Sequence, residues 1–167
     1  DGFGGFEGFE GFDGFEGFGF EEEVSSLHQL EAMLRERLAG TLPGLDAQLR
    51  FMPTPPRTGW KPGDFPSDAR IAAGLLLLYP GPRGMSIPLT VRAGHLKRHA
   101  GQISLPGGAT DEGETLVQAA LREAHEEVGI DPARVRILGE LTPVHVLVSG
   151  FTLHPVLAAS ADPVVRA

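Results

Sequence analysis

The chain has 167 residues, no cysteine and a formal net charge of −8 at pH 7. Its length allows one domain of ordinary size, and the lack of cysteine excludes disulfide bonds and thiolate chemistry, so we expect a cytoplasmic protein. The longest apolar run, residues 71–79, is too short to cross a bilayer, so no membrane partner is expected.

The negative charge belongs to residues 1–23, which hold eight acids and no base. Phe occupies every third position there from Phe3 to Phe18, separated by Gly, Asp and Glu. A period of three fits neither an amphipathic helix nor a strand, and this composition predicts a disordered, low-complexity tail. Residues 24–167 hold fourteen acids and fourteen bases. Because this part is neutral, no nucleic-acid partner is expected.

Residues 24–68 are expected to form a helix and a proline-rich connection, and residues 69–167 the main folded domain. Ser25 or Ser26 can cap the first helix, which should run to about Ala39. The expected later elements are strands at 71–79, 85–92 and 103–105, a helix at 114–128, and strands at 135–148 and 151–158. We expect the second of these strands to form a hairpin with the first. This order predicts an α/β fold with a mixed sheet.

Three carboxylates stand on one face of the helix expected at 114–128. Glu123, Glu126 and Glu127 are spaced i, i+3 and i+4, which places helical side chains side by side. At about 5 Å and an effective dielectric of 20, each pair repels by roughly 3 kcal/mol, so the patch should hold a cation. Hard oxygen ligands favour Mg²⁺ or Mn²⁺, which suit chemistry on phosphate oxygens.

The stretch from residue 108 to 130 resembles the Nudix box, a motif of nine constrained positions. All nine are filled, by Gly108, Glu114, Arg122, Glu123, Ala124, Glu126, Glu127, Gly129 and Ile130. The resemblance implies a Nudix-type α/β/α sandwich with a mixed central sheet. It also implies hydrolysis of a nucleoside diphosphate linked to another group, with metal ions that bind the diphosphate and activate water.

The resemblance assigns roles to individual residues of the motif. Glu123, Glu126, Glu127 and the Gly107 carbonyl are the implied metal ligands, and a sharp turn at the double glycine should aim that carbonyl. Arg122 is expected to orient Glu126 or Glu127, so these three form the implied catalytic set. Glu126 is the candidate general base.

The stretch from residue 89 to 108 is similar to the element that precedes the box in coenzyme A diphosphatases. The matching positions are Leu89, Thr90, Arg92, Ala93, Gly101, Pro106, Gly107 and Gly108. Lys97 stands where the family has Arg, which keeps the charge but loses a bidentate contact, and Leu105 replaces Phe. Basic side chains beside a metal cluster suit a multiply phosphorylated substrate, so Arg92, Lys97 and Arg98 are the expected substrate-binding residues.

The expected reaction is therefore cleavage of coenzyme A to 4′-phosphopantetheine and adenosine 3′,5′-bisphosphate. The alternatives are hydrolysis of ADP-ribose or another nucleoside diphosphate derivative, and a catalytically weak binding domain of the same fold. A homodimer is left open. Such enzymes continue beyond the strand at 151–158, so we expect a domain truncated at its C-terminus. His125 is expected to face solvent, and His145 and His154 to be structural rather than substrate-binding.

Overall fold

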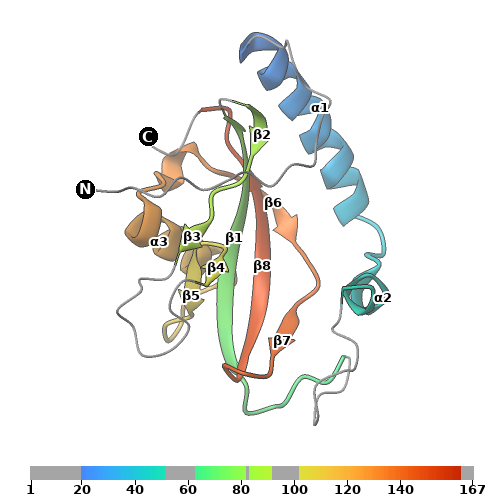
Figure 1. Cartoon of the computed structure of the whole chain (residues 1–167), viewed down its shortest axis with the longest axis vertical. Helices are drawn as coiled ribbons and strands as arrows, with labels where there is room; N and C mark the ends of the chain where they lie inside the picture. The colour runs from blue at the N-terminus through green and yellow to red at the C-terminus, as the bar shows by residue number, and fades with distance from the viewer. Residues whose placement is uncertain (1–19, 52–62, 82, 92–101, 163–167) are drawn as a thin grey trace, which may run out of the picture.

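The computed structural model describes residues 20–51, 63–81, 83–91 and 102–162. Strands form a long, mixed sheet with helices on both sides (Figure 1). In chain order, the elements are α1 (Phe20–Leu38), α2 (Gly44–Leu49), β1 (Arg70–Gly81), β2 (Gly84–Ser86), β3 (Thr90–Val91), β4 (Ile103–Ser104), β5 (Gly107–Ala109), α3 (Leu116–Val128), the 3₁₀ turn η1 (Pro132–Arg134), β6 (Arg136–Glu140), β7 (Val144–Val146) and β8 (Phe151–Ala159). The first residues of the tail and the basic segment at 92–101 lie outside the described residues.

The centre of the sheet is a parallel pair, β1 and β8, in register from Arg70 and Phe151 to Leu78 and Ala159. On the outer side of β1, β5 and β2 pair antiparallel with different parts of the strand. On the outer side of β8, β6 and β7 do the same. A second, two-stranded sheet joins β3 and β4. The expected mixed sheet is confirmed.

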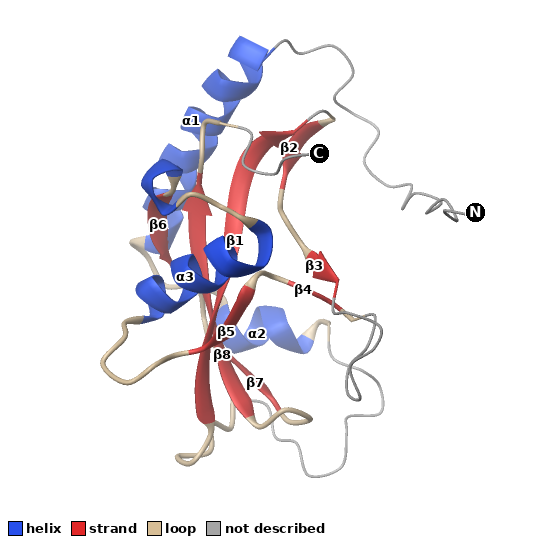
Figure 2. Ribbon diagram, turned by 90° about the vertical axis from the view of Figure 1, so that its left-hand side faces the viewer, coloured by secondary structure: helices blue, strands red, loops and turns tan. Residues whose placement is uncertain are grey.

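The two faces of the sheet have separate cores because successive side chains of a strand point to opposite faces. Leu75 and Leu77 pack under α3, together with its Ala120 and Ala124. On the other face, Leu76 and its neighbours pack against α1. Figure 2 shows α3 crossing the sheet on the face opposite α1. This three-layer arrangement is the expected α/β/α sandwich.

Three expectations for the strands are wrong, each for a local reason. The hairpin partner of β1 is only β2, because residues 87–89 leave the sheet around Pro88, which has no amide hydrogen for a ladder. The expected strand at 135–148 is split into β6 and β7 around Pro143. Gly107 and Gly108 do not form a sharp turn: they belong to β5 and pair with β1.

The first helix also differs from expectation, because α1 begins at Phe20 rather than at a serine cap. It is attached to the sheet by polar contacts as well as by Leu27. Glu31, only 8% exposed, forms an ion pair with Arg136 of β6. Arg35 donates to the Ile137 carbonyl at 3.2 Å. Among the described residues, no helix is long and apolar enough to span a membrane.

Candidate active site

Helix α3 has well-defined ends, which fix the positions of the side chains between them. Thr115 and Gln118 form a reciprocal capping box at its N-terminus, a pairing that the Thr-x-x-Gln spacing signals in the sequence. At the other end Gly129 adopts a left-handed conformation (φ 70°), and its amide donates to the His125 carbonyl at 2.9 Å. Between these ends Ala120 and Ala124 are buried against the sheet.

The outer edge of β5 offers backbone groups to α3. Leu75 donates its amide hydrogen to the Pro106 carbonyl at 2.8 Å. Hydrogen-bonded and non-hydrogen-bonded residue pairs alternate along an antiparallel ladder. The next pair, Gly74 and Gly107, is therefore not hydrogen-bonded, and neither is the pair that contains Ala109. The amide and carbonyl groups of Gly107 and Ala109 therefore point away from β1, toward the helix.

Two of the three predicted carboxylates meet this edge. The Gly107 amide donates to Glu127 Oε2 at 3.1 Å. The carboxyl of Glu123 lies over Gly108, where a Cβ atom would come within 2.5 Å of Glu123 Cδ. Glu126 is more open, with its side chain 58% exposed. We call these three side chains and the outer edge of β5 the acidic edge.

Arg122 connects the acidic edge to the loop before the helix. Its Nε and Nη2 donate to the two carboxylate oxygens of Glu114 at 2.9 and 3.0 Å. Its Nη1 donates to Glu123 Oε1 at 2.7 Å, and Nη2 also donates to the Ala109 carbonyl at 3.1 Å. The expected partners were Glu126 or Glu127, but Arg122 Nη1 lies 3.7 Å from Glu126 Oε2, and its shorter contacts are to Glu114 and Glu123.

These contacts change the ionisation of both partners. The Arg122 guanidinium, followed by the Asp111 amide, lowers the pKa of Glu114 below its usual value of 4.5. Hydrogen bonds to Glu114 and then to Glu123 raise the pKa of Arg122, which therefore stays charged at every working pH. Glu114 thus contributes stability that is present above its unfolded pKa and is lost as the pH falls through its lower folded pKa.

The variant Glu114→Gln is expected to be less stable than the parent protein at pH 6, and the difference in Tm should shrink as the pH falls below 4.5 and through the lowered folded pKa of Glu114. Below the folded pKa the Glu114 carboxyl is protonated in both the folded and the unfolded state, so its charge no longer matters. Thermal denaturation across pH measures this. The control is Glu36→Gln, an exposed position on α1. A Tm difference that does not shrink as the pH falls would contradict the assigned role of the Glu114 charge.

The chemistry of the acidic edge fits a hard divalent cation. Its donors are carboxylate oxygens and the outward-facing Gly107 carbonyl, with no sulfur and no imidazole among them. The arrangement is not closed around a single point: within the described ranges, no three acidic or histidine side chains converge as a metal-binding group. Glu123 is held by Arg122 and Glu127 by the Gly107 amide, so ion binding would draw on side chains that already have partners.

The predicted substrate-binding residues Arg92, Lys97 and Arg98 lie outside the described residues. The strands that flank this basic segment are described, and they are joined. Thr90 Oγ1 of β3 lies 2.9 Å from Ser104 Oγ of β4. The chain then continues from β4 into β5, the strand of the acidic edge.

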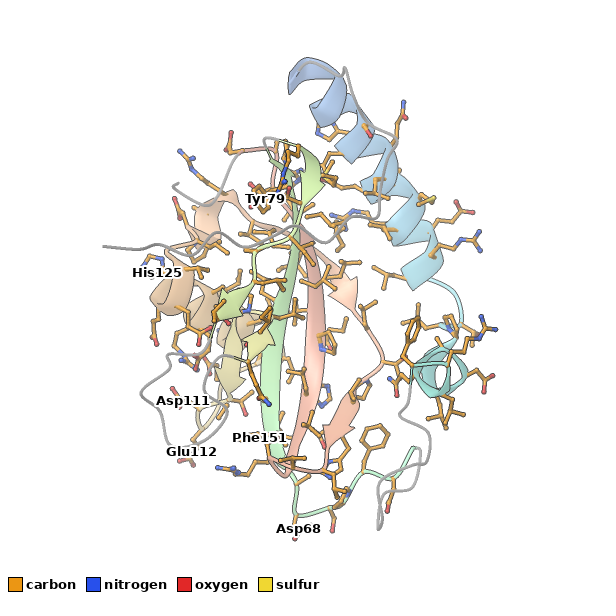
Figure 3. The ribbon with its side chains drawn as sticks, viewed as in Figure 1. Asp68, Tyr79, Asp111, Glu112, His125 and Phe151 are labelled. Carbon is orange, nitrogen blue, oxygen red and sulfur yellow. The ribbon has the colours of Figure 1, made fainter. Side chains whose placement is uncertain are left out.

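The loop between β5 and α3 adds residues that motif matching did not single out. Asp111 and Glu112 lie on it, below α3 in the view of Figure 3. The Asp111 amide donates to Glu114 Oε2 at 3.0 Å, which helps to fix the partner of Arg122. An open depression of about 550 Å³ is lined by Asp111, Glu112, Glu114 and Arg122, among others. Its acidic lining disfavours an anionic substrate.

The histidines have different surroundings. His125 is exposed on the outer side of α3, as expected, and its Nδ1 lies 3.0 Å from the Ile130 carbonyl (Figure 3). His145 and His154 are half-buried on β7 and β8. His145 Nδ1 lies 3.4 Å from the Thr152 hydroxyl. Strand pairing places these two histidines on the sheet face that carries α3, which sequence spacing alone did not reveal.

A family model described as "NUDIX domain" matches residues 68–157, just over half of the chain. The uncharacterized Nudix hydrolase NudL of Enterobacter sp. (strain 638) is 53% identical over 70 residues, which cover 41% of this chain and 36% of NudL. The protein of the same name from Yersinia enterocolitica is 39% identical over 103 residues, which cover 61% of this chain and 52% of that protein. The chain thus spans about half, or less, of the length of these relatives. A solved Nudix hydrolase from M. smegmatis, RenU, is 35% identical, with a TM-score of 0.47 and coverage of 56% of this chain and 63% of RenU.

Proposed function

Because this chain belongs to the NUDIX domain family, we propose that it is a divalent-metal-dependent hydrolase that cleaves the diphosphate linkage of a nucleoside diphosphate derivative. The observation that carries this proposal is the acidic edge, where Glu123 and Glu127 of α3 meet the outward-facing backbone of β5. Oxygen donors gathered next to an open strand edge are a suitable site for a hard cation that also binds phosphate oxygens. We propose Mg²⁺ or Mn²⁺.

The residues proposed to hold the ion are Glu123, Glu126, Glu127 and the Gly107 carbonyl. When bound, the ion supplies Lewis-acid polarisation of a phosphoryl oxygen and lowers the pKa of a coordinated water. The protein itself supplies orientation. Arg122 fixes the Glu123 carboxylate with a 2.7 Å hydrogen bond, and the Gly107 amide fixes that of Glu127.

Glu126 remains the candidate base, since its exposed carboxylate is the least restrained of the three. A base must reach a water molecule without giving up a structural bond. Glu123 is hydrogen-bonded to Arg122 and Glu127 to Gly107, whereas the Arg122 contact to Glu126 is long, at 3.7 Å. In this proposal Arg122 is a positioning residue.

For the substrate we propose coenzyme A, cleaved to 4′-phosphopantetheine and adenosine 3′,5′-bisphosphate. The support is the stretch from residue 89 to 108, with its Leu-Thr-x-Arg-Ala start and its basic Arg92, Lys97 and Arg98. The strands on either side of this segment, β3 and β4, pair with each other, and β4 is followed in the chain by β5. A substrate with a diphosphate and an additional phosphate would use both the ion and the basic side chains.

Turnover assays with Mg²⁺ or Mn²⁺ against coenzyme A, ADP-ribose and NADH test the proposal, with products separated by chromatography. We expect cleavage of coenzyme A at the diphosphate and loss of activity with a chelator. Efficient cleavage of ADP-ribose beside intact coenzyme A would overturn the substrate assignment. If no diphosphate is cleaved while the ligands still bind, the chain is a binding domain rather than an enzyme. The variant Glu123→Gln serves as the inactive control.

A further inference from the structure

The sheet face under the acidic edge continues beyond α3. Ala73 of β1 lies between Gly108 of β5 and His154 of β8, so these three residues form one row across the sheet. Opposed residues of paired strands point to the same face, and Ala73 belongs to the core under α3. His154 therefore lies on the same face as the Glu123 carboxylate, two strands from Gly108, or roughly 10 Å between backbones.

The next row carries a second imidazole. Ile71 of β1 pairs with Thr152 of β8, and Thr152 pairs with His145 of β7. Helix α3 packs on the rows of Leu75 and Leu77, so this row lies beyond it, toward the lower end of the sheet in Figure 2. We call Thr152, His154 and His145 the histidine floor.

The floor brings three polar side chains together on one face of the sheet. Thr152 is only 5% exposed, and its hydroxyl lies 3.4 Å from His145 Nδ1. That contact occupies one ring nitrogen of His145 and leaves Nε2, on the other side of the ring, as the remaining polar atom. His145 and His154 are both only half-buried, so each imidazole keeps part of its ring open to a ligand.

We propose that the histidine floor binds a phosphate group of the substrate other than the one held at the acidic edge. This inference rests on the proposed function, because it takes the acidic edge as the site of the ion. Carboxylates repel an anionic substrate wherever the ion does not offset them, so hydrogen-bond donors on the adjoining sheet surface complement the rest of the molecule. Two phosphates qualify: the second phosphoryl group of the diphosphate, or a separate phosphomonoester such as the 3′-phosphate of coenzyme A.

The first experiment needs neither turnover nor a mutation. Adenosine 3′,5′-bisphosphate is titrated into the metal-free protein, and the histidine ring resonances are followed by NMR. We expect the signals of His145 and His154 to shift together, with one binding constant, while that of His28, exposed on α1, stays in place. If the signals of His145 and His154 do not move, the inference is wrong even if the enzyme cleaves coenzyme A. If they shift while no substrate is cleaved, the proposed function fails and the phosphate site stands.

The second experiment uses two replacements at one position. In His145→Asn the amide can still reach Thr152 but nothing stands at Nε2, whereas the amide of His145→Gln reaches the Nε2 position. We expect KM for coenzyme A to rise about 10-fold in the Asn variant, the lower end of the effect of a hydrogen bond to a charged group. The Gln variant should recover most of this loss, and kcat should change little in either. His154→Ala tests the second imidazole, and His28→Asn is the control.

Parallel assays with 3′-dephospho-coenzyme A identify the phosphate. A rise in KM for coenzyme A alone assigns the floor to the 3′-phosphate. An equal rise for both substrates assigns it to the second phosphoryl group of the diphosphate. An unchanged KM in the His145→Asn and His154→Ala variants, or a fall in kcat alone, overturns the inference.

Discussion

Glu127→Gln is expected to lower kcat by about 10²–10³-fold, the loss typical of removing one electrostatic group from a site that stabilises developing charge. The amide oxygen of glutamine can still accept the hydrogen bond that the Gly107 amide now donates to Glu127 at 3.1 Å. The fold and the β5–α3 contact should therefore persist, while a negative ligand for the ion is lost. Steady-state kinetics with coenzyme A and Mn²⁺ titration by calorimetry measure the two effects.

The control for Glu127→Gln is Glu140→Gln, which removes an exposed carboxylate at the end of β6. It should leave both kcat and the Mn²⁺ affinity within the error of the parent protein. If Glu127→Gln binds Mn²⁺ as tightly as the parent and turns over at the same rate, Glu127 is not a ligand. The acidic edge would then owe its cation affinity to the other two carboxylates.

Gly107→Ala and Gly108→Ala are expected to change different properties: the first should lower stability, and the second should lower activity. A Cβ atom at Gly107 would lie 2.3 Å from the Ala73 carbonyl oxygen and 2.6 Å from Gly74 Cα, both backbone atoms that cannot move alone. We expect Gly107→Ala to lower the free energy of unfolding by about 3 kcal/mol, at the upper end of typical overpacking. Urea denaturation followed by circular dichroism measures this loss.

At Gly108 the clash is with a side chain. The added Cβ atom would lie 2.5 Å from Glu123 Cδ, the far end of a flexible chain that can swing away. Gly108→Ala should therefore keep most of its stability but displace the Glu123 carboxylate, so kcat and Mn²⁺ affinity fall. Gly40→Ala is the control, because the nearest atom to its Cβ is 3.6 Å away. Equal stability losses at positions 107 and 108 would contradict this difference.

The helix of the site was predictable because its signals are local. The apolar spacing of α3, its capping residues and the terminal Gly129 all act within a few positions, and α3 spans Leu116–Val128, close to the expected range. The positions of Glu123, Glu126 and Glu127 on that helix followed from the same periodicity. The Nudix-type sandwich was likewise predictable from the motif and the order of elements.

The role of the double glycine was not predictable in the same way. Glycine usually signals a turn, but Gly107 and Gly108 form a strand because β1 supplies the partner. The backbone of β1 leaves no room for a Cβ atom at Gly107, and the Glu123 carboxyl leaves none at Gly108. The Arg122–Glu114 pair depends on how the preceding loop folds, and the Glu31–Arg136 pair joins residues distant in sequence. Such contacts follow from tertiary packing, which no window of the sequence contains.

The parallel pairing of β1 and β8 has a consequence for how the protein reaches its folded state. Every element of the acidic edge lies in the chain between these two strands, whose pairing begins at Arg70 and Phe151. Contacts between distant residues form slowly, because the chain loses loop entropy before they stabilise it. The contact of Gly107 with Glu127 spans only 20 positions. We expect the acidic edge to assemble early. The histidine floor, which requires β8, should assemble last. Pulse-labelled hydrogen exchange at the Gly107 and Thr152 amides would separate the two events in time.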